Sequence, residues 1–181
     1  LAYLDLDHFK SYNDKYGFAR GDEILRMTGR LLRGIVRELG AKEAHVGHIG
    51  GDDFVFCLPV EPAEAVCLRI VQTFDVILPN FYDEEDRLRG GIEGTDRHGV
   101  PRRFPLVSVS VGVTTTRGGT VREYGDLSRV ASEVKRQAKR CEGSGYLIRS
   151  ADPEDVVRLR AGGPAGAGRA GAGARQASSP G

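Results

Sequence analysis

The chain has 181 residues, of which 40% are hydrophobic and 28% charged, and these proportions predict one soluble domain with a buried core. Its 26 basic residues include two in the Gly- and Ala-rich C-terminus, so 24 remain elsewhere against 25 acidic residues, a net charge of −1. Without a basic excess, we expect no nonspecific binding of nucleic acid. We expect no membrane contact either, because no apolar run is long enough to cross a bilayer. Three widely spaced cysteines without a CxxC pair favour reduced thiols and a cytoplasmic location.

The first part of the chain is predicted to form a strand, a helix and a hairpin. Residues 1–6 read as a strand with its acidic side chains on one face and its leucines on the other. Apolar residues then recur at helical spacing over residues 22–39, and a glycine follows where the helix is expected to end. Residues 44–49 and 54–58 are expected to pair as antiparallel strands around the glycine-acid turn.

The second part of the chain is predicted to add two helices and three strands. These are a helix over 62–78 with a proline in its first turn, an irregular acidic stretch over 81–91, paired strands over 91–96 and 102–115, a helix over 124–140 and a strand over 145–149. The order β-α-β-β-α-β-β-α-β predicts an α+β fold of the split-βαβ, palm-like kind, with helices on one face of an antiparallel sheet.

We expect three regions along the chain. Residues 1–150 form the domain, and residues 151–160 form a short C-terminal extension. Residues 161–181 contain no Val, Ile, Leu, Met or aromatic residue, so this tail cannot bury enough surface to offset its ordering entropy and is expected to be disordered. Because the sequence starts at Leu1 directly in a predicted strand, we expect it to be a fragment of a longer protein.

The stretch "HIGGDDFVF" places two glycines and two acids at the tip of the predicted hairpin. In a split-βαβ sheet the first strand is central and the hairpin pairs against it, so Asp5, Asp52 and Asp53 are expected to converge. Clustered carboxylates suit Mg²⁺, and Gly50 and Gly51 permit a tight turn with open space for a phosphate chain. This is the layout of a phosphoryl-transfer site, although two aspartates in a hairpin turn also occur as a solvated turn without a ligand.

Two motifs together carry a resemblance to a known family. "DLDHFKSYNDKYGFARGDEIL" over 5–25 and "GGDDF" over 50–54 closely resemble the GGDEF domain of bacterial diguanylate cyclases, and the resemblance covers residues 1 to about 149. It implies a nucleotidyl-cyclase-type fold and a homodimer that condenses two GTP into cyclic di-GMP and two pyrophosphates with Mg²⁺ or Mn²⁺. The family normally begins one helix earlier, which implies N-terminal truncation and preceding sensory or regulatory domains.

The resemblance also assigns metal-binding and catalytic residues. Asp5 and Asp52 match the metal-binding carboxylates, with the backbone carbonyl of Leu6 as a further ligand, and Asp53 matches the catalytic acid of the motif. Asn13 and Asp22 match the pair that hydrogen-bonds guanine. A carboxylate can accept from guanine N1 and N2, which adenine does not offer in that pattern. Without the resemblance, Asn13 and Asp22 would be read as a turn former and a helix cap.

The remaining assignments concern the triphosphate of GTP. Phe9 and Lys10 match the segment that faces the phosphates, the glycines at positions 50 and 51 leave room for them, and Lys139 matches a phosphate-contacting lysine. A lone lysine on a helix surface is otherwise simply solvated.

The sequence departs from the family pattern at several positions. Asp53 replaces the usual Glu, Gly143 replaces a frequent arginine, Phe18 replaces a histidine, and the segment over 82–104 is longer than usual. The RxxD motif, with which many members bind their product as inhibitor, is replaced by "AKEA" over 41–44, so we expect no such feedback.

Three functions are compatible with this pattern. The first is an active GTP-condensing cyclase. The second is a catalytically weak GTP-binding domain that regulates an attached partner, which Asp53 and Gly143 favour. The third is a structural dimerisation module, which has no need for the retained set of Asp5, Asn13, Asp22 and Asp52.

Overall fold

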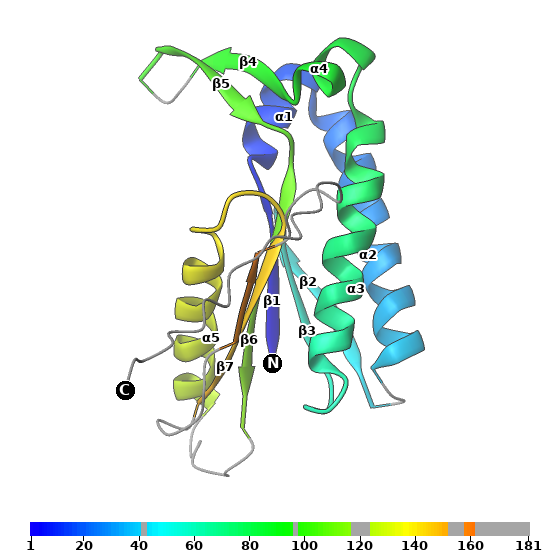
Figure 1. Ribbon diagram of the computed structural model, residues 1–181, viewed down its shortest axis with the longest axis vertical. Coiled ribbons are helices and arrows are strands. Elements are labelled where there is room, and N and C mark those ends of the chain that lie inside the picture. The colour runs from blue at the N-terminus through cyan, green and yellow to red at the C-terminus, as the bar shows by residue number, and fades with distance from the viewer. Residues whose placement is uncertain (41–42, 96–97, 117–123, 152–157, 162–181) are drawn as a thin grey trace, which may run out of the picture.

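The computed structural model describes residues 1–40, 43–95, 98–116, 124–151 and 158–161 (Figure 1). Ala41 of the "AKEA" segment and all but the first residue of the predicted tail lie outside these ranges. Among the described residues, no helix combines the length and the hydropathy needed to cross a membrane. The three cysteines are free, with Cys67 fully buried and Cys57 exposed.

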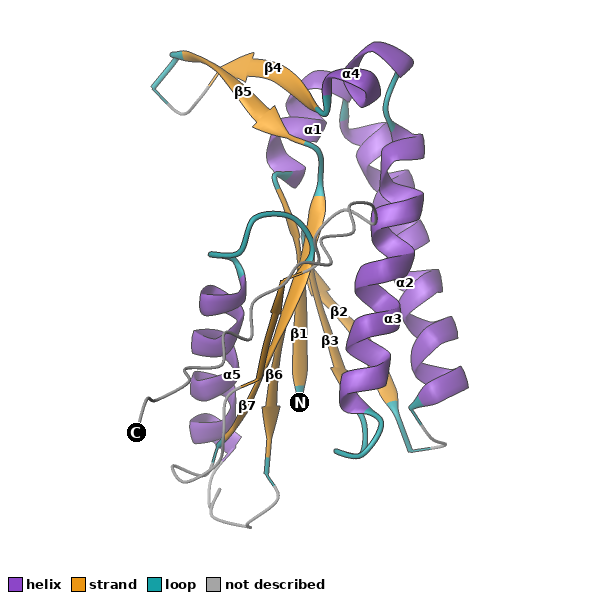
Figure 2. Cartoon of the chain, in the orientation of Figure 1, coloured by secondary structure: helices purple, strands orange, loops and turns teal. Residues whose placement is uncertain are grey.

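Within the described residues, the main sheet has six strands in the order β2-β3-β1-β6-β7-β8. Figure 2 shows this sheet between the helices. The strands are β1 (Ala2–Asp7), β2 (His45–Gly50), β3 (Asp53–Cys57), β6 (Ser108–Thr115), β7 (Gly145–Ser150) and β8 (Arg158–Ala161). Neighbouring strands run antiparallel except for the parallel pair β6 and β7. The first strand is therefore central and the hairpin pairs against it, which confirms the predicted α+β sheet. β8 was not expected from the sequence.

The helices cover both faces of this sheet, so the expectation that they lie on one face is wrong. Helices α2 (Phe18–Leu39) and α3 (Ala63–Ile77) pack on one side, and α5 (Tyr124–Ala138) packs on the other (Figure 1). The cause is visible in β6, where Ser108 to Thr114 are all buried although alternate residues point to opposite faces. A strand with apolar or small side chains on both faces must be packed against other elements on both faces.

The segment between β1 and α2 contains a helix that the periodicity did not reveal. Helix α1 (Phe9–Tyr16) follows β1 directly, and α2 begins at Phe18, four residues before the predicted start. Gly17 separates the two helices with a φ of 84°, a backbone conformation that favours glycine. The short α1 buries only Phe9 and Tyr12, which leaves too few apolar positions to establish a helical period.

The long segment over 82–104 folds into its own small unit beside α1. A 3-10 helix (Leu78–Phe81) leads into this segment, and α4 (Glu84–Arg89) lies where an irregular stretch over 81–91 was expected. The predicted long strand over 102–115 is divided: β5 (Pro101–Pro105) pairs with β4 (Gly91–Thr95) in a separate two-stranded sheet, and β6 begins after it. Pro105 cannot donate a ladder hydrogen bond, and the N–H of Val107 donates to the Tyr82 hydroxyl at 2.7 Å, so the strand breaks between them.

This unit is fixed to the rest of the domain through α4. The carboxylate of Asp86 is buried, accepts a hydrogen bond from the Tyr16 hydroxyl and lies 2.5 Å from Lys15 Nζ. The Arg20 guanidinium donates to the Phe81 carbonyl at 2.7 Å. The rings of Tyr12, Tyr16 and Tyr82 meet between these contacts. The segment is thus held against α1 and α2 by buried polar and aromatic contacts.

Candidate metal and nucleotide site

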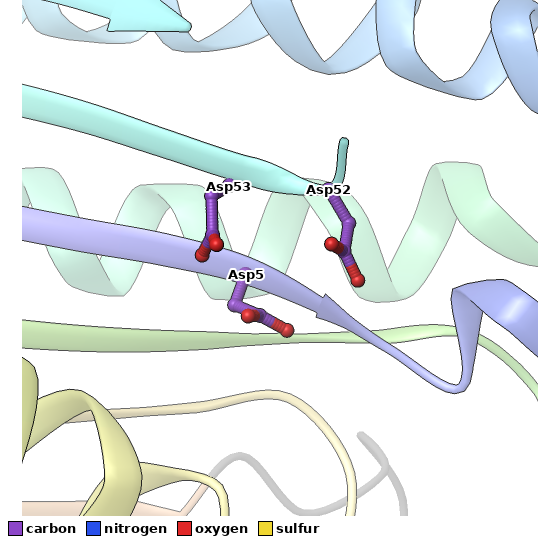
Figure 3. A group of neighbouring side chains, drawn as sticks. All are labelled: Asp5, Asp52 and Asp53. Carbon is purple, nitrogen blue, oxygen red and sulfur yellow. The ribbon is translucent and has the colours of Figure 1, made fainter. Parts of the chain in front are cut away.

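Three aspartates converge where β1 meets the β2–β3 turn (Figure 3). Asp5 on β1 pairs directly with Asp53 on β3, and Asp52 lies in the preceding turn. Each offers a carboxylate oxygen, and these oxygens lie within 4.8 Å of one another. Asp5 is 3% exposed, whereas Asp52 and Asp53 are half-buried. The predicted convergence is confirmed as geometry.

The donor set fits a hard divalent cation. Mg²⁺ takes oxygen ligands at about 2.1 Å, so opposite ligands lie about 4.2 Å apart, which is within the spacing of these carboxylate oxygens. Leu6 follows Asp5 in β1 with its side chain buried in the core, so only its backbone carbonyl can serve as a ligand. Asp5, Asp52 and the Leu6 carbonyl thus remain the predicted metal ligands.

Two lysines reach the aspartate cluster: Lys135 in α5, and Lys139 directly after the end of that helix. Lys139 Nζ lies 2.5 Å from Asp5 Oδ1, which brings this predicted phosphate contact to the site. Lys135 Nζ lies 2.5 Å from Asp53 Oδ1 and 3.5 Å from Asp5 Oδ2. Sequence reasoning missed Lys135, although its position four residues before Lys139 places both on the same face of a helix.

A glycine in β6 determines how closely α5 approaches the sheet. A Cβ atom at Gly112 would lie 2.4 Å from the backbone nitrogen of Lys135 and 2.6 Å from its Cα. No side chain fits there, because the obstructing atoms belong to the helix backbone. Gly112 therefore lets α5 pack directly on β6 and positions Lys135 above the aspartates.

The electrostatics of the cluster follow from burial and from these two lysines. Burial raises the pKa of Asp5, and the Lys139 ammonium beside its Oδ1 opposes that effect. Burial also acts to raise the pKa of Asp53, but the hydrogen bond and charge of Lys135 hold it below its usual value. Asp53 is therefore ionised and paired with Lys135 at neutral pH.

The turn that carries Asp52 has the open geometry predicted from its two glycines. Gly50 and Gly51 have φ angles of 150° and 57°, and a Cβ at either position would meet nothing within 4 Å. His48 supports the turn, since its Nε2 lies 2.8 Å from the Gly51 carbonyl and its ring stacks on Phe54 at 4.4 Å. The predicted tight turn with free space above it is confirmed.

Asn13 lies inside α1 and Asp22 inside α2, so the alternative of a turn former and a helix cap is wrong. The Asn13 side-chain oxygen is buried and accepts no hydrogen bond from the described residues. It packs against Gly21, where a Cβ atom would lie 1.8 Å from it. Asp22 is exposed, with Arg26 Nη2 3.6 Å away.

A hollow of about 330 Å³ lies between α2 and the hairpin. Its lining includes a carboxylate, two guanidiniums and two aromatic or imidazole rings, from Asp22, Leu25, Arg26, Gly29, Arg33, His48 and Phe54. The Asn13 side-chain oxygen next to Gly21 has no hydrogen-bond donor among the described residues, and the Asp22 carboxylate lines the hollow. A nucleobase can donate hydrogen bonds to both groups.

Two predicted phosphate contacts have side chains that point elsewhere. Phe9 is buried in the core, and Lys10 is exposed and lies 2.5 Å from Asp14. Their side chains are therefore not gathered with the aspartate cluster. Phe18, which replaces the family's histidine, is 77% exposed at the start of α2.

The sequence pattern of the family described as "Diguanylate cyclase, GGDEF domain" matches residues 1–144 of this chain. The match covers well over half of the sequence, so the chain belongs to the GGDEF-domain family of diguanylate cyclases. The predicted family resemblance is thereby confirmed.

Individual relatives agree with this membership. Diguanylate cyclase DgcS of Shewanella oneidensis is 41% identical over 73 residues, which cover 39% of this chain and 23% of the relative. The probable diguanylate cyclase DgcF of Escherichia coli is 36% identical over 132 residues, or 72% of this chain and 35% of that protein. The chain thus spans only a minor part of these relatives.

The solved structure of the GGDEF domain of PA1120 (TpbB or YfiN) from Pseudomonas aeruginosa has the same fold. It superposes with a TM-score of 0.52 at 23% identity, covering 83% of this chain and 75% of that one.

Proposed function

We propose that this chain is a diguanylate cyclase domain, which condenses two GTP molecules into cyclic di-GMP and two pyrophosphates as a Mg²⁺- or Mn²⁺-dependent homodimer. The observation that carries the proposal is the meeting of Asp5, Asp52 and Asp53 at the β1–β3 register, beside an open glycine turn. A structural module has no need for three acids with only 4.8 Å between their oxygens.

The proposed reaction forms a bond between a ribose 3′-oxygen and the α-phosphorus of the partner GTP. The bond from that phosphorus to the bridging oxygen breaks, and pyrophosphate leaves with the electron pair. A divalent ion held by Asp5, Asp52 and the Leu6 carbonyl would neutralise charge on the phosphate oxygens. Asp53 is the group that would position the 3′-hydroxyl or accept its proton.

Guanine recognition is assigned to Asn13 and Asp22. The buried Asn13 oxygen, which has no donor among the described residues, can accept a hydrogen bond from the base. The Asp22 carboxylate can accept from N1 and N2 of guanine, whereas adenine would leave these acceptors unpaired. Selectivity for GTP over ATP follows from that difference.

The triphosphate is assigned to the open turn and the neighbouring cations. Gly50 and Gly51 leave space above the backbone, and Lys139 already lies at the cluster. The backbone at the start of α1, through Phe9 and Lys10, would supply further donors because the first N–H groups of a helix have no intrahelical partner. The Lys10 ammonium would have to leave Asp14 to contribute.

A second function is favoured by two departures from the family pattern. Asp53 is one methylene shorter than the usual glutamate, and Gly143 stands in place of an arginine. A domain with these features could bind GTP with little turnover and regulate an attached signalling domain. Because the chain matches only 23% of DgcS and 35% of DgcF, further sensory or regulatory domains fit either function. We place the domain in the bacterial cytoplasm, without nucleic acid or membrane contact.

Incubation of the dimeric chain with GTP and Mg²⁺, followed by chromatography of the nucleotides, separates these functions. Cyclic di-GMP that the wild type forms from GTP and that Asp52→Asn does not form supports the cyclase. Tight GTP binding without product supports the regulatory domain and contradicts the cyclase.

A further inference from the structure

Lys135 contacts two of the three aspartates, and the proposed reaction assigns it no role. Its ammonium lies 2.5 Å from Asp53 Oδ1 and 3.5 Å from Asp5 Oδ2, so it bridges the two paired strands β1 and β3. A cation between two carboxylates is the arrangement that a bridging divalent ion would adopt. Lys135 therefore stands where such an ion would bind.

The position of Lys135 is set by the fold and not by a flexible surface contact. Gly112 admits the α5 backbone onto β6, and the Lys135 side chain is only 21% exposed. Lys139 holds the other oxygen of Asp5, whereas Asp52 makes no ion pair with the described residues. Asp53 is therefore ion-paired with Lys135, whereas Asp52 has no ion pair among the described residues.

We propose that Lys135 is a built-in competitor of the divalent cation: its ammonium occupies the space between Asp5 and Asp53, and a metal ion reaches Asp53 only by displacing it. The inference rests on the proposed metal site. An ion held by Asp5 and Asp52 leaves the Lys135–Asp53 pair intact. Engagement of Asp53 requires the ammonium to move to another anion, such as a bound phosphate.

The charges of the site predict the direction of the effect. Two carboxylates at this separation repel each other, and Lys135 supplies the positive charge that relieves the repulsion. Without it, the uncompensated carboxylates attract a divalent cation more strongly, and no displacement is needed. Removal of Lys135 should therefore tighten metal binding, whereas a lysine that merely orders the site would loosen it when removed.

The test is a titration of the nucleotide-free full chain with Mn²⁺, with free Mn²⁺ measured by electron paramagnetic resonance. Lys135→Met is expected to tighten Mn²⁺ binding at least fivefold. Arg136→Met, which removes the same charge from the exposed neighbouring position, should change it less than twofold. Lys135→Arg retains the cation and is expected to bind Mn²⁺ as the wild type does.

A double variant shows whether the tighter Mn²⁺ binding depends on Asp53. Asp53→Asn added to Lys135→Met should abolish most of the gain, because the ligand that the lysine had masked is then absent. Equal or weaker Mn²⁺ binding by Lys135→Met than by Arg136→Met overturns the inference. A failure of every variant to bind Mn²⁺ overturns the proposed metal site together with it. Tightened binding without any cyclic di-GMP from GTP supports the role of Lys135 and contradicts only the cyclase.

Discussion

At the scale of single residues, the site keeps the carboxylates of the family motif, but one of them stands on a shorter side chain. Asp5, Asp52 and Asp53 supply oxygen ligands, but Asp53 is shorter than the glutamate of the family motif. The lysine at 2.5 Å from Asp53 shows that the surroundings accommodate the shorter acid. We therefore interpret this position as an adapted site.

Asp53→Glu tests that interpretation. The longer side chain would displace Lys135 and misplace its carboxylate by roughly 1 Å, an error that can cost up to about a hundredfold in rate. We expect cyclic di-GMP production to fall on the order of tenfold, with GTP affinity little changed. Asp83→Glu, on an exposed side chain, is the matched control and should leave the rate unaltered. A tenfold gain in cyclic di-GMP production would mean that the change from Glu to Asp53 impairs the reaction and that the site has not adapted to it.

Gly21→Ala tests the guanine contact without altering a polar group. The added methyl would lie 1.8 Å from Asn13 Oδ1, so the amide must move from its buried position. GTP affinity measured by calorimetry is expected to fall at least tenfold, about the loss of one hydrogen bond to the base.

Gly34→Ala on the same helix is the control for Gly21→Ala. Its Cβ meets nothing within 4 Å, so this variant should keep GTP affinity and stabilise the fold by roughly 0.5–1 kcal/mol. Equal GTP affinity in both variants would contradict the assignment of Asn13.

At the scale of elements, the segment over 82–104 is a structured attachment and not a loose loop. Asp86 on α4 connects it to Lys15 and Tyr16 of α1, the helix that also carries Asn13. The attachment therefore borders the same helix as the proposed guanine contact. A loss of the Asp86 contacts is expected to loosen α1.

Asp86→Asn measures the strength of this attachment and its pH dependence. Burial opposes ionisation, but the hydrogen bonds from Lys15 and Tyr16 keep the pKa of Asp86 below its ordinary value of about 3.9. A lowered folded-state pKa gives stability above the unfolded-state pKa that is lost as the pH falls through the folded-state value. We expect the variant to lose roughly 3 kcal/mol of unfolding free energy at pH 7 and progressively less below about pH 4.

The control is Asp83→Asn, which alters a 66% exposed carboxylate paired with Arg20 in the same segment. Its effect in denaturant unfolding should stay within about 0.5 kcal/mol. If the free energies of unfolding of Asp86→Asn and the wild type differ by the same amount at every pH between 3 and 7, the charge of Asp86 does not anchor α4.

At the scale of the whole molecule, one chain offers one proposed nucleotide site, and the product needs two GTP molecules. Specific activity is therefore expected to rise with protein concentration until dimers predominate, whereas GTP binding should stay at one per chain. Sedimentation and turnover measured over the same concentrations check this. A specific activity that is constant while the chain is monomeric would contradict the proposed dimer.

The features that depend on local pattern were predictable from the amino-acid sequence. The alternation in residues 1–6, the helical period after residue 22 and the glycine-acid turn were sufficient to predict β1, most of α2, the hairpin and the meeting of its aspartates with Asp5. These features follow from backbone geometry and residue spacing, which a single sequence contains.

The contacts between distant elements could be found only in the folded structure. The Lys135–Asp53 pair joins residues 82 positions apart. It forms because Gly112 in β6 leaves room for the α5 backbone to pack closely on that strand. The burial of β6 on both faces and the separate pairing of β4 with β5 likewise depend on neighbours far along the chain. Local periodicity carries no information about such partners, because the free energy that selects them comes from packing and ion pairing formed on folding.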